Sequence, residues 1–351
     1  MDAIKNKFHQ DLANLRKLIE FYDIENRLLS DWNLTQKIPE VEYLAELVNK
    51  FTDFNLEKRV FNYNSVIISL YGFFEKFIED CLIAYVLALN ELVENYNSLP
   101  ELVRTSHYRL SLAILNKMDQ DRYRGGYTKE SVIKNLYECI TLHESYQLNS
   151  EAFSQHSANF RQQVIDQSFT YIGLEKISAV LLKDSIFYNY LLHKLQKTDV
   201  SEISFDEAYF ELNDLAERRN EVAHGVPSSI LSSPILLDYI VYFEYYAVAM
   251  VVTLQKNLDI IHLEEYGKRL GEITDVFKNG TVVCFTTNNV EIKVGDILVG
   301  KNEHGIVKGF IKSIQIDDEF VTSIAGGDSE IGVELDAKFK KTHQLFLISS
   351  N

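Results

Sequence analysis

The chain has 351 residues, enough for two domains, and 46% of them are hydrophobic, as in ordinary folded globular proteins. Its formal charge of −16 at pH 7 excludes a general polyanion binder, because the summed field repels phosphate at long range. Any nucleic acid would therefore have to bind at a local basic patch.

The compartment is expected to be a reducing cytoplasm. The three cysteines, Cys81, Cys139 and Cys284, lie far apart and form neither a disulfide framework nor a metal knuckle. The first ten residues, MDAIKNKFHQ, lack the apolar core of a signal peptide. No cluster of His, Asp and Glu has metal-ligand spacing, so we expect neither a metal nor another cofactor.

The first part of the chain, residues 1–262, is predicted to be an all-α bundle, because glycine is rare and apolar residues recur at helical spacing. Its strongest pattern begins at Asn64 and has Leu70, Phe74 and Phe77 at the i, i+4 and i+7 positions of a core face. This predicts a central bundle helix. Glu75 lies at the edge of the apolar face, where a carboxylate needs a cationic partner.

Residues 104–129 are the best candidate for a local RNA-binding patch. Basic side chains outnumber acidic ones there, and tyrosines are interleaved with them. Cations suit phosphates and aromatic rings suit base stacking, which makes four residues of the glycine-containing loop candidate RNA contacts. These are Arg122, Tyr123, Arg124 and Tyr127. The alternative is a solvated surface loop.

The sequence RRNEVAHG, residues 218–225, is the main candidate for chemistry. Ser204 and Glu207 form a capping-box pattern that predicts a helix start, and the apolar stripe that follows places Arg219 at its next position. A guanidinium there requires a carboxylate, a phosphate or a water-filled cleft. Gly225 is predicted to end the helix at His224.

Arg219 and His224 have the side chains that cleavage of an RNA phosphodiester needs. An imidazole can take the 2′-hydroxyl proton, and a guanidinium can neutralise charge on the phosphorus, without a metal. Asn220 lies four residues before His224 and is expected to fix the imidazole tautomer. The alternative is a helix end with a favourable cation.

Two features after this motif complete the predicted domains. The apolar run from Ile235 to Thr253 contains Asp238 and Glu244, so it is predicted to be a buried bundle helix, starting at Ser233 and Pro234, rather than a membrane span. Ten of the fifteen glycines lie between Gly267 and Gly332. Short β-branched runs alternate with turns there, which predicts a small all-β barrel or sandwich over residues 272–351 after a linker, 263–271.

The strands of this region are expected in five segments, one of which contains a Val-Gly-Asp turn. They are GTVVCFTT from Gly280, VEIKVGDILV from Val290, IVKGFIKSIQI from Ile306, EFVTSI from Glu319 and IGVEL from Ile331. The fold class is therefore α+β multidomain, with an all-α bundle followed by an all-β barrel.

Two segments, IISLYGFFEKFIEDCLIAYV and LAERRNEVAHG, together resemble the HEPN superfamily. Within this superfamily they resemble the prokaryotic group of ribonuclease toxins, and the resemblance covers about residues 1–262. The resemblance implies a homodimer with a metal-independent site between protomers. It implies that Arg219 stabilises the phosphate, Asn220 is the polar residue after it, His224 is the acid/base, and Glu75 is an acidic residue of the earlier helix. Arg218 also fits the family spacing, so the choice between the two arginines stays open, and Arg218 is a candidate RNA contact.

The segment from about 270 to 351 resembles domain II of elongation factor Tu, through IKVGDILVG and SIQIDDEF, without any GTP-binding P-loop in the chain. The resemblance implies contact with tRNA or other translation RNA, or alternatively a docking appendage. The function expected is an endoribonuclease of a toxin–antitoxin or anti-phage defence system, with RNA and possibly an antitoxin or regulatory protein as partners and no membrane. The alternatives are a non-catalytic HEPN module that binds RNA, a nucleotide or a protein, and an acceptor of a transferred nucleotide.

Overall fold

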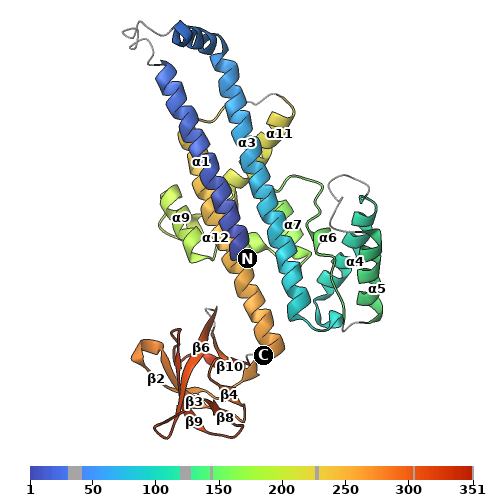
Figure 1. The fold of residues 1–351 in the computed structure, drawn as a ribbon, viewed down its shortest axis with the longest axis vertical. Helices are drawn as coiled ribbons and strands as arrows, with labels where there is room; N and C mark the ends of the chain where they lie inside the picture. Colours follow the sequence, from blue (N-terminus) through green and yellow to red (C-terminus); the bar gives the residue numbers. More distant parts are fainter. Residues whose placement is uncertain (31–41, 119–127, 143–144, 226–228, 303–304, 350–351) are drawn as a thin grey trace. The chain divides into compact units, whose positions relative to one another are not determined.

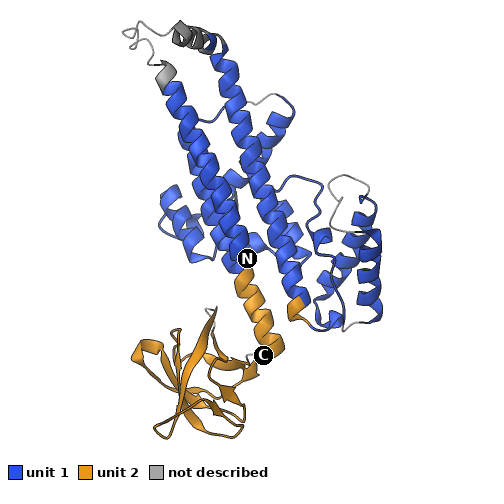
Figure 2. Ribbon diagram, viewed as in Figure 1, with its two compact units in different colours: residues 1–90, 94–253 blue, residues 91–93, 254–351 orange. Residues whose placement is uncertain are grey.

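The computed structural model describes residues 1–30, 42–118, 128–142, 145–225, 229–302 and 305–349, the side chains of 28–30, 42–49 and 51–53 excepted. The chain divides into two compact units, which are distinguished by colour in Figure 2. Unit 1 comprises residues 1–90 and 94–253, and unit 2 comprises residues 91–93 and 254–351. A helical region followed by an antiparallel β-domain is the α+β arrangement that the sequence predicts.

Unit 1 is built around three long helices, α1 (Asp2–Ser30), α3 (Glu42–Leu92) and α12 (Ser233–Tyr266), which run alongside one another (Figure 1). Aromatic rings join them: Phe8 of α1 stacks on Phe77 of α3 at 4.6 Å, and Phe74 of α3 lies 4.8 Å from Phe243 of α12. Phe74 and Phe77 are almost fully buried. The predicted central helix is therefore confirmed, and it begins 22 residues before Asn64, at Glu42.

Helix α12 is the apolar run that could be mistaken for a membrane span. It is the one helix among the described residues that is long and apolar enough to cross a bilayer, and 56% of its most apolar window is buried inside the protein. Glu244 in its middle pairs with Arg16 of α1, both carboxylate oxygens lying 3.0 Å from Nη2. The predicted core helix is thus confirmed, and it starts at Ser233 with Pro234 in the first turn.

Shorter helices surround this bundle. Their bounds are α4 Glu101–Leu115, α5 Lys129–Thr141, α6 Ser150–Phe153, α7 Gln162–Thr170, α8 Ile177–Leu181, α9 Ser185–Leu195, α10 Phe205–Ala208 and α11 Phe210–Ala223, with 3₁₀ turns η1 at Tyr96–Ser98 and η3 at Val200–Glu202. The capping box at Ser204 and Glu207 is present and starts α10, as predicted. The helix that follows is interrupted at Tyr209, whose backbone is not helical (ψ 18°) and which separates α10 from α11.

Unit 2 is built on an antiparallel sheet with the strand order β1-β10-β5-β6-β9-β3-β2. Strand β7 joins this sheet by pairing with β6, and β4 and β8 form a separate two-stranded sheet. The strands are β1 Lys268–Arg269, β2 Ile273–Phe277, β3 Val282–Thr286, β4 Ile292–Lys293, β5 Ile297–Asn302, β6 Gly305–Ile316, β7 Glu319–Val321, β8 Ser323–Ile324, β9 Glu330–Leu335 and β10 Gln344–Ile348, with a 3₁₀ turn, η4, at Lys278–Gly280. All five predicted strand segments contain strands, and the sequence missed β1, β2 and β10.

A single chain segment, residues 268–277, closes this sheet into a barrel. Its first half pairs with β10 and its second half pairs with β3, which are near opposite ends of the strand order. At the crossing point the amide of Leu270 donates to Leu345 O and that of Gly271 to Thr286 O, both at 3.0 Å. A Cβ on Gly271 would lie 2.0 Å from Oγ1 of Thr286, so only glycine fits this crossing.

The predicted linker, 263–271, holds the last turn of α12 and strand β1. Helix α12 continues to Tyr266, and Lys268 already pairs with Leu347 in the barrel. Leu263 is buried against Val299 and Ile348, which explains why the helix persists past the predicted boundary at 262. The division into compact units falls earlier, between residues 253 and 254.

Candidate active site at the end of helix α11

Helix α11 ends at His224, where the sequence predicts it to end. The amide of His224 donates to Asn220 O at 3.0 Å, and the amide of Gly225 donates to Val222 O at 3.1 Å. Gly225 has φ +84°, the left-handed conformation that glycine adopts without strain. The side chain of His224 is exposed at this end of the helix.

The two adjacent arginines have different surroundings. Nη1 of Arg218 donates to Oη of Tyr63 at 2.9 Å and to Ser229 O at 3.1 Å, and its Nε donates to Asp214. Its side chain is 14% exposed. Tyr239 donates to the same carboxylate of Asp214. The guanidinium of Arg218 is therefore held in an internal network, which suits a structural role more than the RNA contact that the sequence left open.

Arg219 is half-buried and faces α3. Its guanidinium carbon lies 5.5 Å from the ring centroid of Tyr71, a cation–π arrangement. In the part of the chain that the structure describes, Arg219 makes no hydrogen bond or ion pair. Its N–H donors thus remain available to an anion, in contrast to those of Arg218.

Glu75 lies one helical turn beyond Tyr71 and beside a histidine from the loop after α6. Oη of Tyr71 accepts a hydrogen bond from the amide of Phe160 at 2.9 Å and lies 3.4 Å from Oε1 of Glu75. Nε2 of His156 lies 3.5 Å from Oε1 of Glu75 and 3.2 Å from Oε1 of Glu79. The cationic partner that Glu75 was expected to need is thus His156, while Tyr71 contacts Glu75 through its hydroxyl and Arg219 through its ring.

His156 is held in a position that favours its protonated form. Its side chain is only 8% exposed and its ring packs on Phe160 with centroids 4.1 Å apart. Burial alone would lower the pKa of His156, but hydrogen bonds with Glu79 and with Ala158 O, and the charge of Glu75, outweigh burial and raise it. Nδ1 lies 2.9 Å from Ala158 O, so both ring nitrogens face acceptors. His156 is thus a largely buried ionisable group that packs on Phe160 and faces two carboxylates.

Asn220 is fixed by the same loop and not by His224. Nδ2 of Asn159 donates to Oδ1 of Asn220 at 2.6 Å and to Ala216 O at 3.3 Å. The amide of Gln162 donates to Oδ1 of Asn213 at 3.0 Å. The structure gives no side-chain hydrogen bond between Asn220 and His224 among the described residues, so the predicted tautomer lock is absent. Residues 156–162 instead tie α3 to α11.

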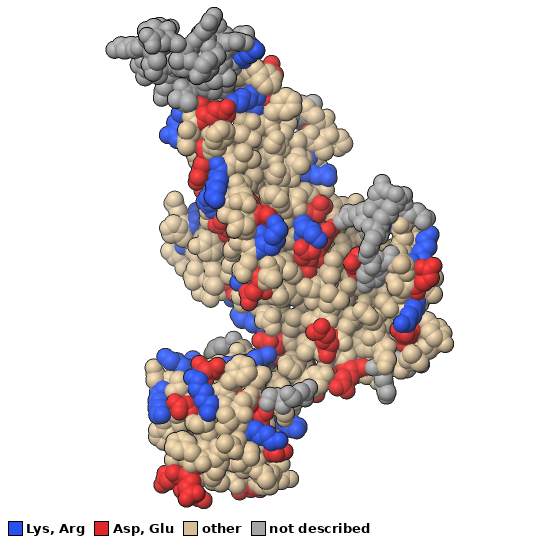
Figure 3. Space-filling model, in the orientation of Figure 1, with Lys and Arg blue, Asp and Glu red and all other residues tan. Residues whose placement is uncertain are grey.

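Five of the nine predicted site residues lie within the part of the chain that the structure describes. Arg219, Asn220 and Glu75 are linked through Tyr71 and the loop of His156 and Asn159, while His224 and Arg218 lie at the end and on another side of α11. The four loop candidates Arg122, Tyr123, Arg124 and Tyr127 lie outside the described residues. On the face shown in Figure 3, the basic and acidic side chains of unit 1 are interspersed.

No local sequence pattern identified His156 or Asn159 as residues of the site. Their partners lie 77 and 61 residues away along the chain, so only the fold brings them together. Among the described residues no group of three or more His, Cys, Asp or Glu side chains is arranged to hold a metal ion. The arrangement as it stands offers an available guanidinium and an exposed imidazole on the last two turns of one helix.

Comparisons with known proteins agree with the helical part of this picture. The family model RiboL-PSP-HEPN matches residues 33–256, which include α3, α11 and most of α12. No curated protein matches. Among solved structures, the C-terminal domain of a putative U32 peptidase from Geobacillus thermoleovorans has 8% identity and a TM-score of 0.20, covering 23% of this chain and 99% of that chain. Such a score carries no argument, so the resemblance of residues 270–351 to domain II of elongation factor Tu stays a prediction.

Proposed function

The chain belongs to the RiboL-PSP-HEPN family, a membership that gives it a nuclease or RNA-related role, and from this premise we propose that it is a metal-independent endoribonuclease. The observation that carries the proposal is the state of Arg219. A half-buried guanidinium without an ion pair among the described residues, five positions before an exposed imidazole, suits the binding of an anion, although the chain carries a net charge of −16.

The geometry of α11 suits one phosphodiester. Residues five apart on a helix are separated by about 7.5 Å along its axis, a distance that the Arg219 side chain can bridge toward the helix end. The Tyr71 ring supports the guanidinium from one side and leaves its N–H groups free to bind phosphate oxygens. His224, exposed at the terminus, is accessible to a strand of RNA.

In the proposed reaction neutral His224 removes the proton of the 2′-hydroxyl, and the 2′-oxygen forms a bond to the adjacent phosphorus. Arg219 neutralises the charge that grows on the non-bridging oxygens. The bond from phosphorus to the 5′-oxygen breaks, and this oxygen takes a proton from an imidazolium. The products are a 2′,3′-cyclic phosphate and a 5′-hydroxyl. One chain supplies one imidazole, so we propose that a homodimer completes the site.

Glu75 and Asn220 are proposed to position Arg219 and α11 rather than to touch RNA. Glu75 accepts from Tyr71, whose ring lies against the guanidinium, and Asn220 is held by Asn159. We further propose that the protein acts in a toxin–antitoxin or anti-phage system, with an antitoxin or regulatory protein as partner. We also propose that the barrel acts on tRNA or other translation RNA. Both proposals rest on the sequence resemblances. Growth after induced expression tests the setting: the wild type should arrest cells and Arg219→Ala should not.

Replacing His224 by Ala tests the mechanism. Cleavage of total RNA by the purified variant should fall by roughly a hundredfold, as the loss of a general acid–base group does. The matched control is His193→Ala, which removes an exposed imidazole of α9 and should leave cleavage unchanged. Undiminished cleavage by a folded His224→Ala variant would refute the assignment. A wild type that binds RNA and never cleaves it would favour the non-catalytic HEPN module.

A further inference from the structure

Residues 156–162 form a strap between α3 and α11, beside the site proposed for RNA cleavage. The contacts of this strap with α11 span about two turns of the helix. Nδ2 of Asn159 donates to Ala216 O and to Oδ1 of Asn220, Arg161 pairs with Glu217, and the amide of Gln162 donates to Oδ1 of Asn213. Arg219 lies within the stretch of α11 that the strap holds.

On α3 the strap is anchored by one largely buried imidazole. Nε2 of His156 lies 3.5 Å from Oε1 of Glu75 and 3.2 Å from Oε1 of Glu79. Its Nδ1 lies 2.9 Å from Ala158 O, inside the strap, and its ring packs on Phe160. His156 therefore joins the strap to α3 through charge, hydrogen bonding and packing at once.

Two of the groups that His156 holds also bind the phenol against which Arg219 rests. Oη of Tyr71 accepts a hydrogen bond from the amide of Phe160 at 2.9 Å and donates to Oε1 of Glu75 at 3.4 Å. The Tyr71 side chain is buried, and the guanidinium carbon of Arg219 lies 5.5 Å from the centroid of its ring. The orientation of this ring, and with it the support of Arg219, thus depends on His156.

Only the protonated imidazole can make all of these contacts together. The Ala158 carbonyl and the two carboxylates are acceptors, so both ring nitrogens have to donate, and a neutral imidazole has a single N–H. Burial lowers the pKa of His156, but hydrogen bonds with Glu79 and Ala158 O and the charges of Glu75 and Glu79 raise it by more. Among the described residues, these two carboxylates of α3 are the charged groups that face the imidazole. Loss of the proton leaves a nitrogen lone pair facing them, and the repulsion frees Glu75.

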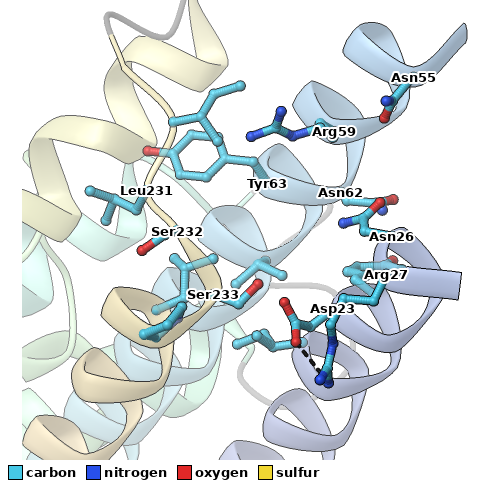
Figure 4. Close-up of a pocket in the computed structure, with 16 residues that line it drawn as sticks. Asp23, Asn26, Arg27, Asn55, Arg59, Asn62, Tyr63, Leu231, Ser232 and Ser233 are labelled. Carbon is cyan, nitrogen blue, oxygen red and sulfur yellow. Dashed lines mark ion pairs between the residues drawn. The ribbon is translucent and has the colours of Figure 1, made fainter. Parts of the chain in front are cut away.

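The other side of α11 is held by contacts that involve no imidazole. Arg218 donates to Oη of Tyr63 and to Ser229 O. Tyr63 lines a cavity of about 590 Å³ between α1, α3 and the segment that leads into α12 (Figure 4). Neither Arg219 nor any residue of the strap lines this cavity. Deprotonation of His156 should therefore leave the Arg218 side of α11 in place and act on the Arg219 side alone.

We propose that His156 is a positioning residue for RNA cleavage, whose protonated imidazole holds Glu75 and the strap so that Arg219 stays directed at the phosphate. This inference rests on the proposed function, because Arg219 is the group whose position it explains. It adds a proton-dependent control to that function. Phosphate binding at Arg219 weakens when His156 loses its proton in alkaline solution.

A double-mutant cycle on RNA cleavage at pH 6.5 tests the coupling of the two residues. His156→Gln should slow cleavage roughly tenfold in the wild-type background and less than about twofold in the Arg219→Ala background, where the positioned group is absent. A merely structural role would give the same factor in both backgrounds. His193→Gln, which removes an exposed imidazole of α9, should change neither rate. Thermal melting checks that each variant is folded.

RNA binding by the His224→Ala protein separates this inference from the nuclease function. The probe is a 2′-O-methyl oligoribonucleotide, followed by fluorescence anisotropy at pH 6 and pH 9. The Kd should rise roughly fivefold between the two pH values, and the further substitution His156→Gln should make it equally high at both.

The outcomes distinguish the two claims. Equal factors in both backgrounds of the cycle would overturn the role of His156, and so would a pH dependence of binding that survives in the His156→Gln protein. A wild type that shows the binding pattern and never cleaves RNA would overturn the nuclease function alone. A protein that neither binds nor cleaves RNA would overturn both.

Discussion

Replacing His156 by Gln should destabilise the protein more at acidic than at alkaline pH. The imidazole lies between Glu75 and Glu79 at 3.5 and 3.2 Å, with side-chain exposures of 8%, 28% and 13% for the three residues. Hydrogen bonds to charged groups contribute about 1.5–3 kcal/mol. We therefore expect a loss of about 2 kcal/mol when His156 is protonated, equivalent to a fall in Tm of roughly 4–8 °C.

The pH dependence follows from the direction of the pKa shift. The pKa of His156 is raised in the folded protein above its ordinary value of 6.5. A raised folded pKa gives stability that is fully present below pH 6.5 and is lost as the pH rises through the folded pKa. The difference between wild type and His156→Gln should thus be about 2 kcal/mol at pH 5.5 and shrink to roughly 0.5 kcal/mol at pH 9.

Urea denaturation followed by circular dichroism at the two pH values measures this difference. His193→Gln is the control, because its imidazole is exposed on α9, and it should cost little at either pH. An equal loss for His156→Gln at pH 5.5 and pH 9 would refute the charged arrangement, since packing against Phe160 does not depend on pH.

Three further substitutions test the end of α11. Arg218→Ala should cost roughly 2–3 kcal/mol in thermal unfolding, because Asp214 loses its ion pair and Tyr63 loses the hydrogen bond from Arg218. Arg219→Ala should cost less than about 1 kcal/mol yet reduce RNA cleavage by roughly a hundredfold; equal stability losses for the two variants would reverse their assigned roles. Gly225→Ala should cost about 1 kcal/mol, because alanine is strained at a φ of +84°. No steric clash should add to this cost, since a Cβ there meets no described atom within 4 Å. An unchanged Tm would contradict the left-handed helix end.

Local sequence patterns were sufficient for the helix starts and the main strands. The capping box at Ser204 and Glu207 and the proline at position 234 act within one helical turn, so no distant residue was needed to find them. Strand β1 escaped notice for the opposite reason. Lys268 and Arg269 carry no alternating apolar pattern and form a strand because barrel closure places them beside β10.

The candidate site shows the same limit. The sequence identified Arg219 and His224 by type and spacing, but it could not choose between Arg218 and Arg219, because the difference lies in Tyr63 and Ser229, which bind only the former. Asn220 was expected to hold His224, four residues away, and is held by Asn159, 61 residues away. Helical spacing shows which residues share a face, while the partner on the opposite element depends on tertiary packing.

The most direct test of the central claim, that Arg219 and His224 cleave RNA by activating a 2′-hydroxyl, uses a paired substrate. A cleaved RNA is first mapped, and the same oligonucleotide is then made with a single 2′-deoxynucleotide on the 5′ side of the cut. The wild-type protein should cut the all-ribose strand, leaving a 2′,3′-cyclic phosphate and a 5′-hydroxyl, and should spare the substituted bond. Cleavage of both strands at similar rates would contradict the account.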